Sequence, residues 1–263
     1  MTQRNKIYFA SDLHLGAPDH AASLLREKHF VRWLKHIQHE TSELYLLGDI
    51  FDFWFEYRHA VPKGFVRLMG QLAEMADAGI VIHIFTGNHD LWYRDYFPKE
   101  INARVYTQPV IREIHGRKFY LAHGDGLGPG DNGYKWMKKV FTNRLNQWLF
   151  TRLHPDYGIS LANFFSGLSR NHNYTGTNEK EVFHHGEKEY LYIHAREVLR
   201  QVPDINAFVF GHRHILIQEE LTPHCELVML GDWIQYFSFL CVNEEGIQLD
   251  VFPMLPHQNP AVV

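Results

Sequence analysis

The sequence predicts an α/β protein, and three of its features support that prediction. The chain has 263 residues, 45% of them hydrophobic, so it can bury a full core as one large domain with an insertion. Short apolar runs typical of buried strands alternate with longer segments whose apolar residues recur at helical spacing. Several of these runs end in acidic, imidazole or amide side chains. The pattern indicates βαβ units, whose parallel strands carry a polar site at their carboxyl ends.

The N-terminal part alternates regularly between the two kinds of element. We expect strands over residues 7–10, 44–47 and 80–85, and amphipathic helices over 21–39 and 65–78. The second helix stops at Gly79, a residue suited to the position after a helix C-terminus. Strand, helix, strand, helix, strand at this spacing predicts a parallel sheet.

The C-terminal part has a different pattern. Residues 110–114 and 118–122 flank His115-Gly116 and predict a hairpin, and the core resumes with a strand over 206–210. Three further runs, with a turn at 243–246, suggest the closing strands of a second, more antiparallel sheet; they cover residues 227–230, 236–242 and 247–252.

The composition excludes several classes of protein. Lys and Arg number 26 against 30 Asp and Glu, so the chain has no overall basic field and we expect no nucleic-acid partner. Cys225 and Cys241 are its only cysteines, which excludes a disulfide framework and predicts two unpaired thiols in a reducing cytoplasm. We find no signal peptide and no run of about 20 apolar residues. We therefore expect a cytoplasmic protein that is soluble or attached to a membrane surface.

Five predicted strand ends supply side chains that can bind metal ions. These are Asp12 and His14; Asp49 and Asp52; Asn88, His89 and Asp90; His123 and Asp125; and His212 and His214. Carboxylate, imidazole and amide groups together suit Mn²⁺, Fe²⁺ or Zn²⁺. The set is too large for one ion, so we expect a two-metal site bridged by Asp49, which follows a central strand.

The spacing within two of these groups also suggests how they converge. In Asp12-x-His14 and in His212-x-His214, an extended chain would point both side chains to the same side. Two divalent ions held in this way lower the pKa of a shared water and neutralise charge on a phosphoryl group. The expected chemistry is phosphoester hydrolysis.

Taken in order along the chain, these motifs resemble those of the calcineurin-like metallophosphoesterases. They are Asp12-x-His14, Gly48-Asp49-x-x-Asp52, Gly87-Asn88-His89-Asp90, His123-Gly124-Asp125 and Gly211-His212-x-His214. The resemblance implies a two-sheet β-sandwich flanked by helices, and two divalent ions with Mn²⁺ as the first choice. The first ion would take Asp12, His14, Asp49 and His214, and the second Asp49, Asn88, His123 and His212. His89, oriented by Asp52, would be the unligated catalytic histidine that meets the phosphate and the leaving oxygen.

The segment from Gly48 to Trp54 and the glycine-rich run after His123 resemble a branch of this family that acts in lipid A biosynthesis. Its members hydrolyse the lipid-linked nucleotide sugar UDP-2,3-diacylglucosamine to UMP and 2,3-diacylglucosamine 1-phosphate, and they carry an inserted helical cap. The resemblance implies a core of residues 1–130 and 200–255, a cap of residues 131–199 and a tail of residues 256–263. The implied substrate contacts are Asn88, His89, Asp131, Ser169, Asn173 and His212. This chain has Gly176 in place of a cap lysine, and His89 in place of an arginine found in proteobacterial members.

Within the expected cap, residues 135–153 combine apolar residues at helical spacing with five basic residues, and no acidic residue follows until Asp156. Such a helix suits anionic lipid headgroups and acyl chains, which would place the protein peripherally on the inner membrane. A cap helix packed on the core with a solvated basic face fits the sequence equally well.

Two rival functions fit parts of the sequence. One is a metallophosphoesterase acting on a nucleotide, a nucleic acid or a phosphoprotein; the other is a scaffold that has lost catalysis, although none of the expected ligands is missing. We expect Asp90 and Asp125 to support ligand loops and not to bind metal. Arg213 could reach phosphate or point to solvent.

Overall fold

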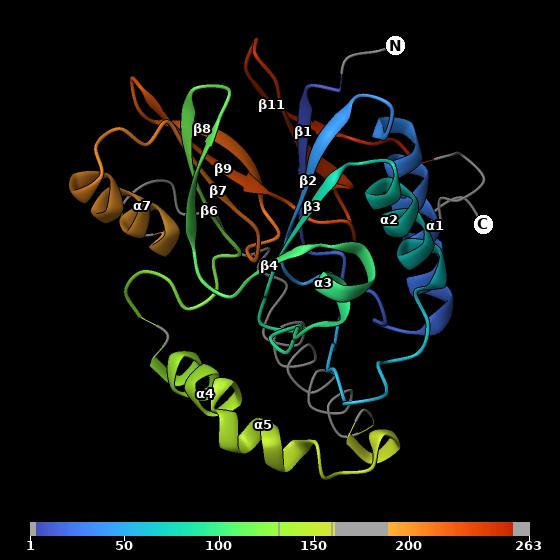
Figure 1. Ribbon diagram of the computed structural model, residues 1–263. Coiled ribbons are helices and arrows are strands. Elements are labelled where there is room, and N and C mark those ends of the chain that lie inside the picture. Colours follow the sequence, from blue (N-terminus) through green and yellow to red (C-terminus); the bar gives the residue numbers. More distant parts are fainter. Residues whose placement is uncertain (1–3, 131, 159, 161–188, 255–263) are drawn as a thin grey trace.

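The computed structural model describes residues 4–130, 132–158, 160 and 189–254 (Figure 1). Two β-sheets pack face to face, with helices α1 and α2 beside the first sheet and α7 beside the second (Figure 1). The two-sheet sandwich flanked by helices, expected from the motifs, is therefore confirmed.

The first sheet has six strands in the order β11-β10-β1-β2-β3-β4. Strands β1 to β4 are parallel, β10 pairs antiparallel with β1, and β11 pairs antiparallel with β10. Helices α1 (His20–Ile37), α2 (Val66–Asp77) and α3 (Tyr96–Ile101) belong to this half. Its strands are β1 (Lys6–Ala10), β2 (Thr41–Leu47), β3 (Val81–Phe85), β4 (Arg104–Tyr106), β10 (Ser238–Val242) and β11 (Ile247–Val251).

The second sheet has five strands in the order β5-β6-β7-β9-β8. Strands β6, β7 and β9 are parallel at its centre, and β5 and β8 are antiparallel edges. Helix α7 (Tyr190–Gln201) buries Leu191 and Ala195 against the outer face of this sheet. Its strands are β5 (Val110–Ile114), β6 (Arg117–Ala122), β7 (Ala207–Phe210), β8 (Leu216–Thr222) and β9 (Cys225–Leu230).

Alternate residues of the central strands pack on opposite sides, which explains why these runs are almost wholly apolar. Phe9 and Tyr45 point between the two sheets, where their rings stack with centroids 4.7 Å apart. Their neighbours Tyr8 and Leu44 point the other way, into the cluster that also contains α1 and α2. Each central strand is therefore held in place by packing on both of its faces. This packing also fixes the point from which the following loop begins.

The expectation that the last three strands close one sheet is wrong. Strand β9 lies in the second sheet, whereas β10 and β11 extend the first. Strand β8 was not expected at all, because its sequence contains Glu219 and Glu220 and its exposure alternates along an edge. Hydrophobic pattern identifies strands here, but it does not say which sheet a strand joins.

The single basic helix expected over residues 135–153 is interrupted. Helix α4 (Asn132–Thr142) and helix α5 (Arg144–Phe150) meet at Asn143, whose side-chain oxygen accepts the N–H of Leu145 at 2.8 Å. An asparagine oxygen that caps a new helix competes with the backbone bonding of the preceding one. The described residues of α4 and α5 include no buried side chain.

Two expectations from composition can be compared with the structure. Cys225 and Cys241 are both free thiols, as predicted. None of the helices among the described residues combines the length and the apolar character needed to cross a bilayer.

Candidate metal centre

The carboxyl ends of β1, β2, β3, β6 and β7 lead into loops that bring the predicted ligands together. Three groups of acidic and imidazole side chains place ligand atoms within 4.8 Å of one another among the described residues. They are Asp12, His14 and His214; Asp49, His123 and His212; and His14, Asp49 and His89. His14 belongs to the first and third groups, and Asp49 belongs to the second and third. The three groups therefore form one continuous centre.

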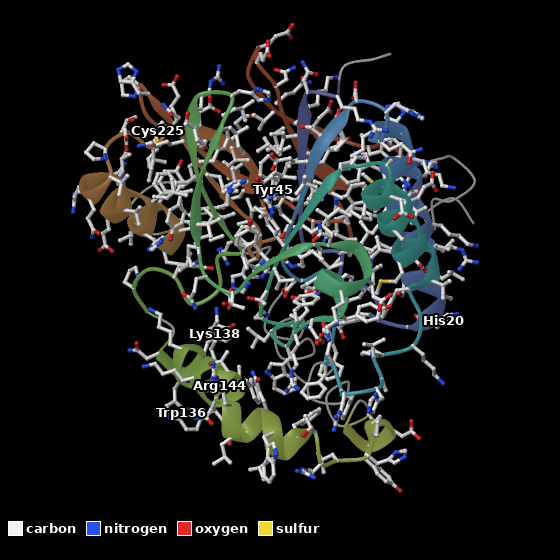
Figure 2. The ribbon with its side chains drawn as sticks, viewed as in Figure 1. His20, Tyr45, Trp136, Lys138, Arg144 and Cys225 are labelled. Atoms are coloured by element: carbon white, nitrogen blue, oxygen red, sulfur yellow. The ribbon has the colours of Figure 1, made fainter. Side chains whose placement is uncertain are left out.

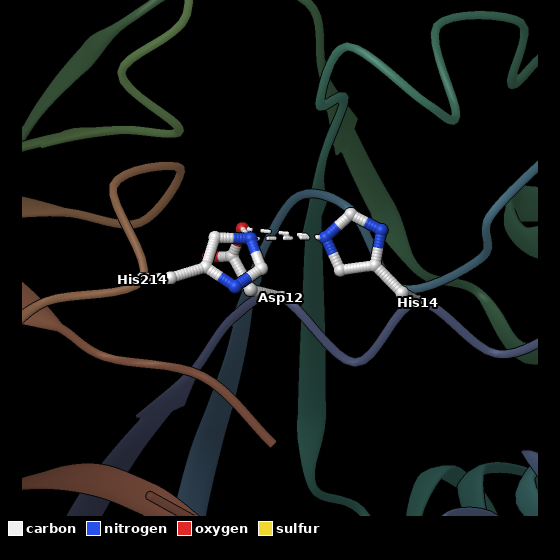
Figure 3. Close-up of side chains that lie close together, drawn as sticks. All are labelled: Asp12, His14 and His214. Atoms are coloured by element: carbon white, nitrogen blue, oxygen red, sulfur yellow. Dashed lines mark hydrogen bonds and ion pairs between the residues drawn. The ribbon is translucent and has the colours of Figure 1, made fainter. Parts of the chain in front are cut away.

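The first group faces a common point (Figure 3). His14 Nε2 lies 3.2 Å from His214 Nε2, and Asp12 Oδ1 lies 3.3 Å from His214 Nε2 and 3.8 Å from His14 Nε2. Asp12 Oδ1 is buried and accepts no hydrogen bond from any residue that the structure describes. Donor atoms bound to one cation by bonds of about 2.1 Å lie roughly 3 Å from each other. The three side chains therefore fit a divalent cation.

The second group is arranged around Asp49, which is 1% exposed. His123 Nε2 lies 3.3 Å from Asp49 Oδ2 and 3.2 Å from Asn88 Oδ1. The same Asp49 oxygen lies 3.6 Å from His14 Nε2, which belongs to the first group. Asp49 thus stands between the two groups, as a carboxylate that touches two ions must.

Left-handed backbone, and not extended chain, makes the ligands converge. Asp12 and His14 have φ of 57° and 44°, His212 and His214 have 67° and 50°, and Asp49 has 53°. The expectation that Asp12-x-His14 and His212-x-His214 are extended is therefore wrong. Each left-handed non-glycine residue costs about 1–2 kcal/mol, and such strain persists where the surrounding fold enforces it, commonly at functional sites.

Three glycines let the ligand loops approach closely. A Cβ on Gly87 would lie 2.1 Å from Asp49 Oδ1, and a Cβ on Gly48 would lie 2.6 Å from His123 Nδ1. A Cβ on Gly211 would lie 2.6 Å from Asp12 Oδ2. Contacts this short cannot exist, so only glycine permits the observed arrangement.

Asp90 supports two ligand loops at once, as the sequence predicts. Its carboxylate accepts the backbone N–H groups of Asp49 at 3.1 Å and Gly87 at 2.8 Å, and the hydroxyl of Tyr93 at 2.6 Å. Burial, followed by the charge of Asp49, raises the pKa of Asp90 above its usual value. These bonds hold the loop after β2 against the loop after β3.

His89 and Asp52 lie beside the two groups. His89 Nδ1 is 3.5 Å from Asp52 Oδ1 and 3.2 Å from the Asp52 carbonyl oxygen. The backbone N–H of His89 donates to Asp49 Oδ1 at 2.8 Å, and its ring stands edge-on to that of His14 at 4.7 Å. His89 is thus held at the rim of the centre, close to the ligand atoms of His14 and Asp49.

The carboxylates of the centre are kept ionised by the histidines around them. Burial alone would raise the pKa of Asp49, but the charge of His123 and other neighbours lowers it below its usual value. Burial likewise opposes the ionised form of Asp12, and the charge of His214 nevertheless holds the Asp12 pKa well below its usual range. Two buried carboxylates so close together require positive charge between them.

The histidines respond in two opposite ways. Burial would lower the pKa of His123, but Asp49 raises it to about 10. Burial also works against protonated His14, whose pKa the carboxylates of Asp12, Asp52 and Asp49 raise to about 9. Burial and the charge of His123 lower the pKa of His212 to about 4. Protons on His14 and His123 would have to leave before a cation could bind, because a metal ligand must be the neutral imidazole.

Asp232 belongs to the centre and was missed in the sequence. Its Oδ2 lies 3.0 Å from His214 Nδ1. Part of the signal that identified the other residues was present, since Gly231-Asp232 directly follows the predicted strand that became β9, but a single acidic residue at a strand end is a weak signal.

Two other polar residues have partners away from the centre. Asp125 pairs with Lys138 of α4 at 2.6 Å and accepts the hydroxyl of Tyr134, so it ties α4 to the loop after β6. Arg213 forms two hydrogen bonds of 3.1 Å to Glu189, so it does not simply point to solvent.

Helices α4 and α5 are joined to the rim of the centre on both sides. Lys138, which is labelled in Figure 2, bonds to Asp125 after β6. Trp92 Nε1, after β3, donates to the Phe141 carbonyl at 2.8 Å. Phe150 of α5 packs against Trp92 with ring centroids 5.0 Å apart. The remaining expected substrate contacts, Asp131, Ser169 and Asn173, lie outside the described residues, as does much of the expected cap.

Comparison with known proteins gives matches of three kinds: a family model, named relatives and solved structures. Residues 5–216 match the model of a family described as calcineurin-like phosphoesterase. A Porphyromonas gingivalis protein named UDP-2,3-diacylglucosamine hydrolase is 40% identical over 247 residues, which are 90% of this chain and 93% of that protein. A protein of the same name from Actinobacillus succinogenes is 25% identical over 93% of this chain and 98% of its own length. Among solved structures, an E. coli phosphoesterase covers 97% of this chain and 95% of its own at 15% identity, with a TM-score of 0.45.

Proposed function

Because the chain belongs to the calcineurin-like phosphoesterase family, we propose that it hydrolyses the pyrophosphate bond of UDP-2,3-diacylglucosamine to UMP and 2,3-diacylglucosamine 1-phosphate. The chain is a metal-dependent phosphoester hydrolase by family. The substrate is supported by the name and near-complete coverage of the P. gingivalis relative. The observation that carries the proposed chemistry is the position of Asp49 between two groups of ligand atoms.

We propose that the centre holds two Mn²⁺ ions. Asp12, His14, Asp49 and His214 would hold one, and Asp49, Asn88, His123 and His212 the other. When bound, two divalent ions lower the pKa of water and neutralise charge on a phosphoryl group. The fit of these residues to cations is supported by the buried Asp12 oxygen, to which none of the described side chains donates a hydrogen bond, and by the facing nitrogens of His14 and His214.

The side chains around the ions would bind and orient the diphosphate. His89 Nδ1 is engaged by Asp52, so Nε2 is the atom that we propose contacts the phosphoryl oxygen and gives a proton to the leaving oxygen. Asn88 and His212 would contact the same phosphate. Asp131, Ser169 and Asn173 would contact the rest of the substrate from the cap.

We propose that the cap is formed by the chain between residue 131 and helix α7. Helix α7 itself packs on the second sheet, and we therefore assign it to the core. Described residues of α4 and α5 carry exposed aromatic and basic side chains. Trp136 is 69% exposed and Trp148 50% exposed, and the exposed Arg144 lies between them in the sequence. Figure 2 shows Trp136 and Arg144 on these helices. Such a surface suits acyl chains and anionic headgroups. We therefore propose that the protein works peripherally on the cytoplasmic face of the inner membrane.

The proposal is tested by removing metal from the purified protein, restoring Mn²⁺, and following release of UMP from UDP-2,3-diacylglucosamine. Bis(p-nitrophenyl) phosphate is the comparison substrate. We expect the lipid-linked substrate to be strongly preferred, with activity that depends on Mn²⁺. Cleavage of the generic diester alone would reject the substrate and leave a metallophosphoesterase of another specificity.

A further inference from the structure

Asp232 stands directly behind one of the proposed metal ligands. Its Oδ2 accepts a hydrogen bond from His214 Nδ1 at 3.0 Å, while Nε2 of the same ring faces Asp12 Oδ1 at 3.3 Å and His14 Nε2 at 3.2 Å. A carboxylate oxygen can only accept, so the proton of a neutral His214 must lie on Nδ1. The lone pair on Nε2 is then directed into the centre.

The other half of the Asp232 carboxylate is also occupied, and Asp232 is fully buried. Oδ1 accepts three backbone N–H groups of the following turn, at 3.0, 2.7 and 3.1 Å, from Ile234, Gln235 and Tyr236. The loop itself is attached to the centre, because the N–H of Trp233 donates to the Asp12 carbonyl at 3.1 Å. Asp232 therefore cannot turn away from His214 without breaking the turn.

We propose that Asp232 is a positioning residue that selects the metal-binding tautomer of His214. This inference rests on the proposed two-metal function. Hydrogen bonds from the second nitrogen of a ligand histidine fix its tautomer and ring orientation, and their loss weakens metal binding about 10–100-fold.

The other ion position is organised differently. There, His123 Nδ1 bonds to the backbone carbonyl of Leu47 at 2.7 Å, so no side chain sets its tautomer. Substitution of Asp232 should therefore weaken the binding of one ion and leave the binding of the other unchanged. This asymmetry separates a role in metal binding from a general loss of the fold.

Asparagine is the informative replacement at this position. Its amide has one oxygen and one NH₂ group, and the three N–H donors of the turn hold the oxygen. The NH₂ group is then turned towards His214 Nδ1, which must accept and so carries no proton. The proton moves to Nε2, which can no longer bind a metal ion.

The experiment compares wild type, D232N and D232A. Mn²⁺ per chain and its affinity are measured by equilibrium dialysis with metal analysis, and EPR distinguishes an exchange-coupled Mn²⁺ pair from a single ion. The Tm in excess EDTA reports the stability of the metal-free protein, to which the turn after Asp232 contributes. We expect wild type to bind two ions, and D232N to keep one while the other binds about 10–100-fold more weakly. In EDTA, D232N should keep a higher Tm than D232A, because its amide oxygen still accepts the three N–H groups of the turn.

Two results would overturn the inference. One is D232N that binds Mn²⁺ with wild-type affinity and stoichiometry. The other is a Tm of D232N in EDTA that falls as far as that of D232A. The weaker metal binding of D232N would then be explained by disruption of the turn and not by the tautomer of His214. Wild type that binds fewer than two ions would instead contradict the two-metal proposal. If wild type binds a single ion, D232N that binds this ion with wild-type affinity would still refute the role of Asp232.

Discussion

The Nε2 atoms of His14 and His214 lie 3.2 Å apart, although 200 residues separate the two histidines in the chain. One follows the first strand of the first sheet and the other follows β7 of the second, so the sandwich itself brings them together. Two neutral imidazole nitrogens so placed repel each other unless a proton or a cation lies between them. The fold that buries the core therefore also forms, at the edge where these strands end, a site that favours a bound cation or proton.

Gly87→Ala should displace Asp49, because the new Cβ would lie 2.1 Å from Asp49 Oδ1 and 2.5 Å from its backbone nitrogen. We expect turnover to fall at least about 100-fold, with fewer Mn²⁺ ions bound per chain. Gly70→Ala is the matched control, since its Cβ would meet no described atom within 4 Å outside its own stretch of helix. Wild-type turnover by Gly87→Ala would show that Asp49 need not hold its present position.

His89→Asn should separate catalysis from metal binding. If His89 contacts the phosphoryl group and is not a ligand, kcat falls by about 10²–10⁴-fold, the usual contribution of a general acid. The number of Mn²⁺ ions bound should not change. A variant that loses an ion would place His89 among the ligands, a role that its closeness to His14 and Asp49 also permits.

Replacing both Trp136 and Trp148 by Ser should weaken binding to vesicles containing anionic lipid. Full burial of a large apolar side chain contributes roughly 1.5–3 kcal/mol, and an indole enters the bilayer interface only in part, so we expect a drop of at least about tenfold in the partition coefficient in vesicle sedimentation. Val66→Ser is the control, because Val66 is 73% exposed but lies on α2. Equal sedimentation of all three proteins would argue that α4 and α5 do not meet lipid.

The stability of the fold should fall in mild acid because of His29. Burial, followed by the charge of Arg32, lowers the pKa of His29 to about 4. In the unfolded chain His29 has a pKa near 6.5, so the unfolded chain binds the proton more readily than the folded protein does. The contribution of neutral His29 to folding stability is therefore fully present above pH 6.5 and is lost as the pH falls towards 4. The loss is about 2–3 kcal/mol.

His29→Gln provides the comparison, since Gln can still donate to the Phe252 carbonyl that His29 Nε2 meets at 3.2 Å. Urea unfolding at pH 7 and pH 4 should show a smaller change in the variant than in wild type. The same change in both proteins would locate the acid sensitivity elsewhere.

The sequence was sufficient to place the site because each buried strand ends abruptly in polar residues. A run such as Leu44 to Leu47 has to be covered on both faces, and its carboxyl end then has to open at the edge of the sheet. The residues that follow it, beginning with Asp49, could therefore be assigned to a common edge before their contacts were known.

Other features depend on contacts that no local pattern contains. The left-handed backbone of Asp12 and His14 is imposed by loops packed against them, such as the one that carries Gly211. The sheet that a strand joins is decided by distant partners, which is why β10 was misassigned. Asp232 was overlooked because a single acidic residue after a strand carries little information until its neighbour, His214, is seen.

The central claim is that scattered donor groups hold a pair of cations through Asp49. It is tested most directly by counting Mn²⁺ bound per chain at equilibrium in wild type and in Asp49→Ala, with turnover measured on the same samples. We predict two ions and full turnover for wild type, and loss of both ions together with turnover for the variant. Undiminished turnover by metal-free protein in excess chelator, or by Asp49→Ala with two ions bound, would contradict the claim.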